Sequence, residues 1–296
     1  MKNKKLSAFS FIELSIVILI IGILVAGIVS SSRLVGQYRI TSARNTSSSS
    51  SIASIQNMVL WMDVVAENKL TNTSDVAPVD GDRVKTWVDA NPQSTTPLTF
   101  TQSSAGAGPI YKTNGINNLP ALYYQGTVAG GTGTGESLAG CLTNGAYDAT
   151  INPGRFTAFF VLQPLVDVTS NSGSVFSSIG SGTGYSLTKT ASKLTTKFAG
   201  STAVDVTASV RNSYIVTMIR NSTAQNYYLN GTAGVAVTAS YTANSDTATG
   251  IGCTATPGLY FNGYISEIII FDRDLKAEER QSVETYLSKK YAIKLI

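Results

Sequence analysis

The N-terminal part of the chain holds a long apolar run with a carboxylate near its start. Residues 14–28 are almost wholly apolar, Glu13 precedes them, and Lys2, Lys4 and Lys5 stand further upstream. A run of about twenty mostly apolar residues is long enough to cross a bilayer as a helix. A charged side chain in hydrocarbon costs about 2.5 kcal/mol or more, so it usually has a partner and a function. We therefore expect a hydrophobic helix in which Glu13 has a specific role.

The residues around Glu13 follow the order of a processing signal. A basic leader, residues 1–8, ends on the small residue Ala8; Phe9 follows, and Glu13 is the fifth residue counted from Phe9. This order resembles the N-terminal segment of type IV pilins and pseudopilins, although the family usually has Gly where this chain has Ala8. The resemblance implies cleavage by a prepilin peptidase between Ala8 and Phe9, with methylation of the new amine. It also implies that Glu13 pairs with the amine of Phe9 on a sister subunit in a filament.

Two plainer interpretations of this segment stay open: an ordinary signal anchor, and a secretory signal peptide removed after the apolar run. A conventional signal peptide has an apolar core of about 7 to 15 residues, whereas this run is longer and contains Glu13. The pilin-like interpretation divides the chain into a leader (1–8), a helix and Ser-rich stalk (9–56, with a membrane span over 9–29) and a globular domain (57–296). It predicts a single-pass protein of a bacterial inner membrane whose C-terminal domain is periplasmic, and which then enters a pilus or secretion filament or reaches the cell surface.

Charge and composition exclude several functions. Removing Lys2, Lys4 and Lys5 with the leader from 22 basic residues leaves 19, against 18 acidic residues. The mature chain is then close to neutral and has no electrostatic footprint for nucleic acid. The sequence contains no histidine, which excludes a histidine general base, a histidine metal site and a Ser-His-Asp triad.

The segment after the apolar run is polar but free of proline. Leu34, Val35 and Tyr38 are spaced loosely enough for a helix that continues the apolar one. Residues 46–51 form a serine run, and serine competes for backbone hydrogen bonds and disfavours helix interiors. We expect the helix to end in this run. The alternative is a flexible stalk, because Ser-rich segments also behave as linkers.

The remainder of the chain predicts a β-sandwich of the jelly-roll type. Short stretches rich in branched and aromatic residues alternate with Gly, Asn and Ser clusters, a pattern typical of such folds. Asn230-Gly231 is the sharpest hairpin signal, because a type I′ turn needs positive φ at both central residues. The expected strands are 57–63, 84–89, 98–101, 121–125, 156–162, 175–179, 194–198, 214–219, 227–229, 235–238 and 264–271.

Four motifs add a second resemblance, over residues 57–293. Leu60–Asp63, Trp87–Asp89, Asn114–Leu122 and Phe261–Glu267 stand in the order seen in concanavalin A-like or laminin-G-like domains of bacterial surface proteins. The C-terminal part of the chain also fits this resemblance, because a strand, a turn and then a helix are expected there. Glu278 and Glu279 in its first turn and Lys289 and Lys290 in its last suit the helix dipole. A stripe of side chains should pack this helix on the sandwich: Val283, Tyr286, Leu287 and Lys290.

Acidic residues provide the candidates for catalysis and calcium. A glycosidase needs two carboxylates about 5 to 9.5 Å apart, and Glu267, Asp272 and Asp274 are the one acidic cluster of interest. Residues 267 and 272 would point to opposite faces of a regular strand, so a structural role for Glu267 and a turn-holding role for Asp272 or Asp274 are favoured. Calcium would need carboxylate and carbonyl oxygens; no spaced loop signature supports it, so we expect no metal site and no cofactor. Aspartates considered for it are Asp63, Asp80, Asp82, Asp89 and Asp272.

Glycine-rich and aromatic residues are weaker signals. The loops 130–135 and 180–184 lack the strand before and the helix after that a phosphate-binding loop requires, so surface loops are favoured. Tyrosines can stack on sugars, but those in strands more often belong to the core or to cross-strand pairs. The tyrosines concerned are Tyr111, Tyr123, Tyr124, Tyr185, Tyr241, Tyr260 and Tyr264.

The two cysteines, Cys141 and Cys253, are expected to form a disulfide. In an oxidising compartment two cysteines favour a bridge over a metal pair, and two buried thiols remain the alternative. The whole chain is then expected to be a pilin-like structural subunit of a type IV pilus or type II secretion-like filament. It would display a jelly-roll domain for contact with a glycan or protein ligand, and it would not be an enzyme. The alternatives are a membrane-anchored glycan-processing enzyme and a pseudopilin that binds secretion partners.

Overall fold

The computed structural model describes most of the chain. The described residues are 11–103, 108–126, 140–145, 155–166, 173–178, 184–198, 203–238, 248–254 and 259–296, without the side chains of 27–33. The chain divides into two compact units, Met1–Ser42 and Ala43–Ile296. The second unit therefore begins upstream of residue 57, where the sequence analysis began its globular domain.

Helix α1 (Phe11–Ser48) ends in the serine run, as predicted. The hydroxyls of Ser48 and Ser49 donate to the carbonyl of Asn45 at 3.3 and 2.6 Å, beside the backbone N–H of Ser49 at 2.9 Å, so serine side chains compete with the backbone for this carbonyl at the end of the helix. A 3-10 turn, η1 (Ser51–Ser54), follows. Ala43 and Ile52 are buried within the second unit, so residues 43–54 are packed and the flexible-stalk alternative does not hold for them.

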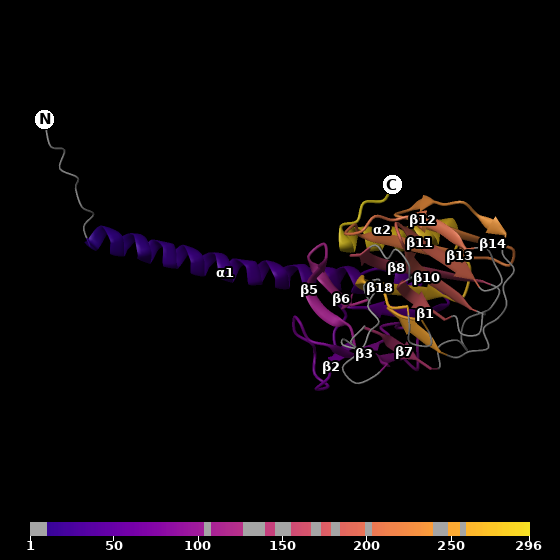
Figure 1. Cartoon of the computed structure of the whole chain (residues 1–296), viewed down its shortest axis with the longest axis horizontal. Coiled ribbons are helices and arrows are strands. Elements are labelled where there is room, and N and C mark those ends of the chain that lie inside the picture. Colours follow the sequence, from indigo (N-terminus) through magenta and orange to yellow (C-terminus); the bar gives the residue numbers. More distant parts are fainter. Residues whose placement is uncertain are drawn as a thin grey trace, which may run out of the picture. The chain divides into compact units, whose positions relative to one another are not determined.

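The second unit is a sandwich of two antiparallel sheets, which confirms the predicted mainly-β class (Figure 1). Sheet A has the order β15-β14-β13-β8-β18-β6-β5, with β1 also paired to β18 and β16 to β14; sheet B has the order β12-β11-β10-β9-β17-β7-β4-β3-β2. The strands of sheet A are β1 (Met58–Asp63), β5 (Ile110–Ile116), β6 (Leu119–Tyr124), β8 (Phe156–Pro164), β13 (Tyr214–Arg220), β14 (Ala224–Leu229), β15 (Thr232–Ala233), β16 (Val237–Thr238) and β18 (Gly263–Phe271). Those of sheet B are β2 (Leu70–Asn72), β3 (Val84–Val88), β4 (Thr99–Gln102), β7 (Leu142–Asn144), β9 (Gly173–Ser177), β10 (Tyr185–Thr190), β11 (Lys193–Phe198), β12 (Val204–Thr207) and β17 (Thr249–Ile251).

Strand β18 is the axis of sheet A. It pairs with β8 along most of its length, and its other edge pairs with β6 at one end and with β1 at the other. A β-bulge interrupts the β8 pairing between Ile265 and Glu267. Ile265 and Ile268 consequently both face the core between the sheets although they are three residues apart. The same bulge places Glu267 on the outer face of sheet A.

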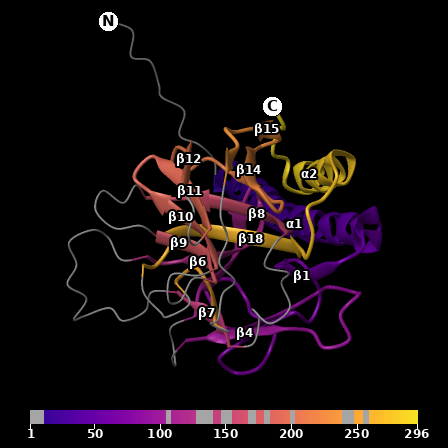
Figure 2. The same ribbon diagram turned by 90° about the vertical axis from the view of Figure 1, so that its right-hand side faces the viewer.

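Two apolar cores hold the unit together. The larger lies between the sheets and contains stacked aromatic rings, among them Phe176 and Tyr185 with centroids 5.6 Å apart. The second lies on the outer face of sheet A, which α2 (Ala277–Tyr291) covers. Figure 2 shows this order of layers, with β9–β12 of sheet B, then β8 and β18 of sheet A, then α2. The predicted helical stripe is confirmed: Val283, Tyr286, Leu287 and Lys290 are all buried.

The sequence analysis predicted β8, β13 and β18 and the Asn-Gly hairpin correctly. Asn230 and Gly231 connect β14 to β15 with φ of 49° and 84°, the left-handed region that a type I′ turn requires. The sequence analysis missed β2, β5, β7, β10, β12, β15 and β17. Several of these are two or three residues long, and such short segments become strands only because a neighbouring strand pairs with them.

A charged clamp fixes the start of α2. The guanidinium of Arg273 donates to both carboxylate oxygens of Glu279 at 2.7 Å. Glu279 also accepts from the backbone N–H of Lys276 at 2.9 Å, which is the reciprocal bond of a capping box. These hydrogen bonds, that of Arg273 first, lower the pKa of Glu279 to about 2.

The clamp predicts a pH-dependent contribution to stability. The native pKa of Glu279 lies below its ordinary value of 4.5, so the contribution is present above about pH 4.5 and is lost as the pH falls toward about 2. Because Glu279 is partly exposed, we expect Glu279→Gln to lower the free energy of unfolding by about 1 kcal/mol at neutral pH. Urea unfolding of the full chain at pH 7 and pH 3 should show this difference shrinking in acid. Glu278→Gln, at an exposed position of the same turn, is the control, and an equal loss in both variants would contradict the role of the clamp.

Candidate functional site

Two acidic side chains face each other on neighbouring strands of sheet A. Asp63 on β1 and Glu267 on β18 are direct cross-strand partners, and both are buried. Like charges at such positions repel each other and destabilise a sheet. Lys290, from the last turn of α2, lies between them. Its Nζ is 2.8 Å from Asp63 Oδ2 and 2.6 Å from Glu267 Oε2, and its side chain is 0% exposed.

Further donors surround the two carboxylates. Ser47, at the end of α1, donates its hydroxyl to Asp63 Oδ2 at 3.0 Å, and the backbone N–H of Val65 donates to Asp63 Oδ1 at 3.0 Å. The hydroxyl of Tyr286 donates to Glu267 Oε1, and that of Tyr291 to Oε2, at 2.8 and 2.9 Å. Trp61 Nε1 donates to Glu267 Oε1 at 2.8 Å. We call this cluster the lysine junction: Ser47, Trp61, Asp63, Glu267, Tyr286, Lys290 and Tyr291.

Burial raises the pKa of three side chains of the junction. Burial raises the pKa of Glu267, the positive charge of Lys290 opposes this rise, and the negative charge of Asp63 reinforces it. Burial also raises the pKa of Tyr286 and of Tyr291 well above the usual value, so both hydroxyls stay protonated and act as donors. The junction thus holds an amine, two carboxyl groups and several donors in an environment closed to solvent, where no polysaccharide could reach the carboxyl pair.

The sequence analysis singled out Asp63, Glu267 and Lys290 but not their association, and it did not consider Tyr291. Glu267 has the predicted structural role, and Lys290 lies on the predicted buried stripe. The link to Asp63 was missed, because Asp63 and Lys290 are 227 residues apart. The available signal was a lysine at an apolar position of an amphipathic helix, together with single acids in apolar strands, since a buried charge needs a partner of opposite charge.

Other acidic residues are used within the chain. Among the described residues, no three His, Cys, Asp or Glu side chains gather so as to hold a metal ion. Asp80 accepts from the backbone N–H of Thr113, and Asp82 from the amide of Asn72. Asp274 accepts from Arg155 at 3.2 Å. The turn before α2 is held by a residue that the sequence analysis did not consider: Thr157 Oγ1 donates to the carbonyl of Arg273 and accepts from the N–H of Leu275.

A half-exposed tyrosine pair lies on the outer face of sheet A. Tyr123 on β6 and Tyr264 on β18 are cross-strand partners with ring centroids 5.3 Å apart. Gln163 on β8 is the next residue in the same row, and its amide donates to the carbonyl of Arg211 at 2.9 Å and to the hydroxyl of Ser213 at 3.3 Å. We call Tyr123, Tyr264 and Gln163 the tyrosine face. Of the other candidate tyrosines, Tyr124 and Tyr185 are buried in the core, whereas Tyr241 lies outside the described residues.

A polar groove runs between η1 and α2. It has a volume of about 510 Å³, and a second hollow of about 390 Å³ adjoins it at Ser51 and Ser282. Hydroxyl, amide and charged side chains line the groove, which suits hydrogen bonding to a polar ligand rather than burial of an apolar one. The residues that line the larger part are Ser51, Ser54, Ile55, Gln56, Arg273, Glu278, Glu279 and Ser282.

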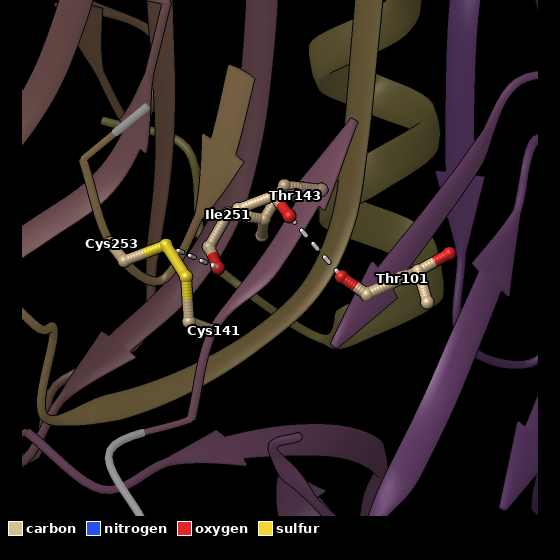
Figure 3. Close-up of a disulfide and its surroundings, with 5 residues drawn as sticks. All are labelled: Thr101, Cys141, Thr143, Ile251 and Cys253. Atoms are coloured by element: carbon tan, nitrogen blue, oxygen red, sulfur yellow. Dashed lines mark hydrogen bonds between the residues drawn. A yellow bond between two sulfur atoms is a disulfide. The ribbon is translucent and has the colours of Figure 1, made fainter. Parts of the chain in front are cut away.

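The predicted disulfide between Cys141 and Cys253 is confirmed. Cys141 immediately precedes β7, and Cys253 follows β17 after one glycine, so the bridge fastens two three-residue strands that pair with each other (Figure 3). Thr143, on β7, donates its hydroxyl to the carbonyl of Thr101 on the next strand, β4, at 3.5 Å. Short strands contribute few ladder hydrogen bonds, so a covalent link here stabilises the middle of sheet B.

The first unit consists of most of α1. Glu13 is exposed in the first turn of this helix, and the apolar side chains near it are exposed as well. The predicted processing residues Ala8 and Phe9, and the glycine loop 130–135, lie outside the described residues. The predicted membrane span over 9–29 is not supported within the described part, where no helix is both long and apolar enough to cross a bilayer. The described part of α1 leaves out the side chains of 27–33.

Comparison with known proteins shows the fold alone. No family model matches the sequence, and no curated protein matches it. The receptor-binding domain of botulinum neurotoxin type G is similar, with 14% identity and a TM-score of 0.52 over 79% of this chain and 52% of that one. Botulinum neurotoxin type C matches with 11% identity and a TM-score of 0.54 over 80% of this chain and 52% of that one. A sialidase of Trypanosoma rangeli matches with 12% identity and a TM-score of 0.52 over 79% of this chain.

The chain spans about half the length of the two toxin chains and 33% of the sialidase chain. These similarities agree with the jelly-roll β-sandwich that the sequence predicted.

The disulfide predicts a loss of stability when it is removed. It closes a loop of 112 residues, for which chain entropy gives about 4 to 5 kcal/mol as an upper value. We expect Cys141→Ser with Cys253→Ser to lower the free energy of unfolding by about 2 to 5 kcal/mol in urea titration. Ser103→Ala, at a partly buried position near the same strands, is the control. A double variant as stable as the wild type in the absence of reductant would contradict this contribution.

Proposed function

We propose that this chain is a filament subunit of the type IV pilin kind, which displays its β-sandwich for contact with glycans. The observation that carries the proposal is the apolar surface of α1. Phe11 is 85% exposed and Ile16 is 50% exposed, and further apolar side chains up to Val25 are exposed on all sides of the helix. A helix that is apolar all round needs an apolar environment.

Both environments of a pilin-like helix satisfy this need. Before assembly the bacterial inner membrane would cover α1, and after assembly the α1 helices of sister subunits would cover it. The proposal also gives Glu13 a role. Cleavage after Ala8 by prepilin peptidase would create a positive N-terminal amine on Phe9, and the amine of a neighbouring subunit would neutralise the charge of Glu13. In this proposal the sandwich is periplasmic before assembly and lies on a pilus or secretion filament afterwards, where the disulfide fits an oxidising environment.

Binding is favoured over catalysis for the sandwich. The carboxyl pair of Asp63 and Glu267 is closed to solvent and occupied by contacts with Lys290, so it does not present the open pair that glycoside hydrolysis needs. This favours a subunit with a contact function over the membrane-anchored glycan-processing enzyme. A pseudopilin that binds secretion partners through the same sandwich is the remaining alternative.

Replacing Glu13 should impair filament assembly more than it impairs folding of the subunit. Because the proposed partner of Glu13 belongs to another subunit, Glu13→Ala is expected to leave the amount of subunit in the cell unchanged. Its incorporation into sheared filaments, measured by immunoblot, should fall about tenfold or more, since loss of a charged pair in apolar surroundings exceeds 1.4 kcal/mol. Ser15→Ala is the control, because the hydroxyl of Ser15 donates within its own helix to the carbonyl of Ile12.

Two results would count against the filament proposal. Normal incorporation of Glu13→Ala would remove the role assigned to that carboxylate. Mass spectrometry of the filament-associated protein should find Phe9 as the first residue; an intact Met1, or a start beyond Ile28, would contradict pilin-like processing.

The tyrosine face is the proposed glycan contact. The type C toxin is described as dependent upon interaction with two ganglioside molecules for cell entry, and the sialidase structure is a complex with sialic acid. Among partly exposed residues of this sandwich, adjacent aromatic rings with a neighbouring amide offer what a sugar needs, a flat apolar surface and hydrogen bonds at its edge. Tyr123, Tyr264 and Gln163 provide this combination.

Binding to glycans should depend on the ring of Tyr123. We expect the full chain to bind to some of the glycans on an array of sialylated and neutral oligosaccharides. Tyr123→Ala should weaken retention several-fold, as loss of an aromatic contact of about 1 kcal/mol predicts. Tyr123→Phe keeps the ring and should keep most of the affinity. Equal binding by the Ala variant, or no retained glycan, would contradict a glycan site at this face.

A further inference from the structure

The lysine junction combines groups that can react with each other. Lys290 Nζ donates to a carboxyl oxygen of Asp63 at 2.8 Å and touches a second carboxyl group, Glu267, at 2.6 Å. All three side chains are at most 1% exposed. We propose that Lys290 and Asp63 become joined by an intramolecular amide bond, with Glu267 as the catalytic proton-transfer group. This inference is independent of the filament and glycan proposals.

The surroundings of Asp63 suit attack on its carboxyl carbon. The backbone N–H of Val65 donates to Oδ1 at 3.0 Å, so a negative charge that develops on this oxygen meets a fixed donor. Oδ2 accepts from Lys290 and from the hydroxyl of Ser47, and it is the oxygen that would leave. Tyr291 and Tyr286 donate to Glu267 and hold its carboxyl group beside the amine.

The reaction needs no reagent from outside. In the neutral form of the junction, the Lys290 amine attacks the carboxyl carbon of Asp63 and a nitrogen-carbon bond forms. Glu267 donates its proton to the Oδ2 hydroxyl, the carbon-oxygen bond breaks, and water leaves. The ionised Glu267 then accepts the extra proton from nitrogen. An amine and a carboxylic acid are thereby converted to an amide and water, and Glu267 ends in its initial state.

The interior of the protein favours this step. In water an amine and a carboxylic acid exist as hydrated ions, which makes condensation unfavourable; in the junction both groups have lost that hydration. Fixed contact between the reacting groups replaces a bimolecular encounter. Burial raises the pKa of Glu267, which supplies the proton donor. The amide would join β1 to α2 across 227 residues, so that the first strand and the last helix of the sandwich could not separate.

Intact-mass measurement of the full chain tests the proposal. After reduction and denaturation, the wild type is expected to weigh less by one water molecule than its sequence requires, allowing for N-terminal processing. A protease digest should contain one branched peptide that joins the segments of Asp63 and Lys290. Lys290→Met and Glu267→Gln should have the full mass. Lys289→Met, at an exposed position next to Lys290, should still weigh less by one water molecule than its sequence requires.

Asp63→Asn gives a chemical check. Its amide would release ammonia in place of water, so the linked variant should have the same mass as the linked wild type. A wild type at full mass with separate Asp63 and Lys290 peptides would overturn the proposal, and this measurement does not depend on the folding of any variant. A water loss that persists in Lys290→Met would also overturn it, because the loss would then lie elsewhere.

Discussion

The contact of Lys290 with Asp63 and Glu267 is the constraint on which the outer half of the sandwich depends. Two carboxyl groups face each other on paired strands within an apolar layer, an arrangement that is unfavourable without a cation. Lys290 supplies the charge from α2, and Ser47 supplies a hydroxyl from the end of α1. Sheet A, α2 and the last turns of α1 are thereby fixed at one point.

This arrangement separates structural from contact surfaces. Around the junction, α2 and residues 43–54 cover sheet A, while Tyr123 and Tyr264 remain partly exposed on the same face of the sheet. Jelly-roll sandwiches serve many functions, so the fold shared with the toxins and the sialidase does not select one. The proposed roles rest on side chains instead: the acid pair is buried, whereas the rings of Tyr123 and Tyr264 are partly exposed.

Local patterns predicted the parts whose physics is local. β8, β13 and β18 have seven to nine residues, enough branched and aromatic side chains to be recognised by composition. The capping acids of α2 and the Asn230-Gly231 turn follow from backbone geometry within a few residues. By contrast, β7 and β17 have three residues each, and they are strands because they pair with each other and are joined by Cys141 and Cys253.

The sequence by itself determined the mainly-β class, the terminal helix with its buried stripe, and the cysteines available for a bridge, because periodicity and turn chemistry act over short distances. Only the tertiary structure decided that a bulge at Ser266 turns Glu267 outward and that Asp63 and Lys290 meet there. Pattern shows that Lys290 lies on an apolar stripe, but not which acid it contacts. That choice depends on the register of β1 against β18 and on the packing of α2, which are properties of the whole fold.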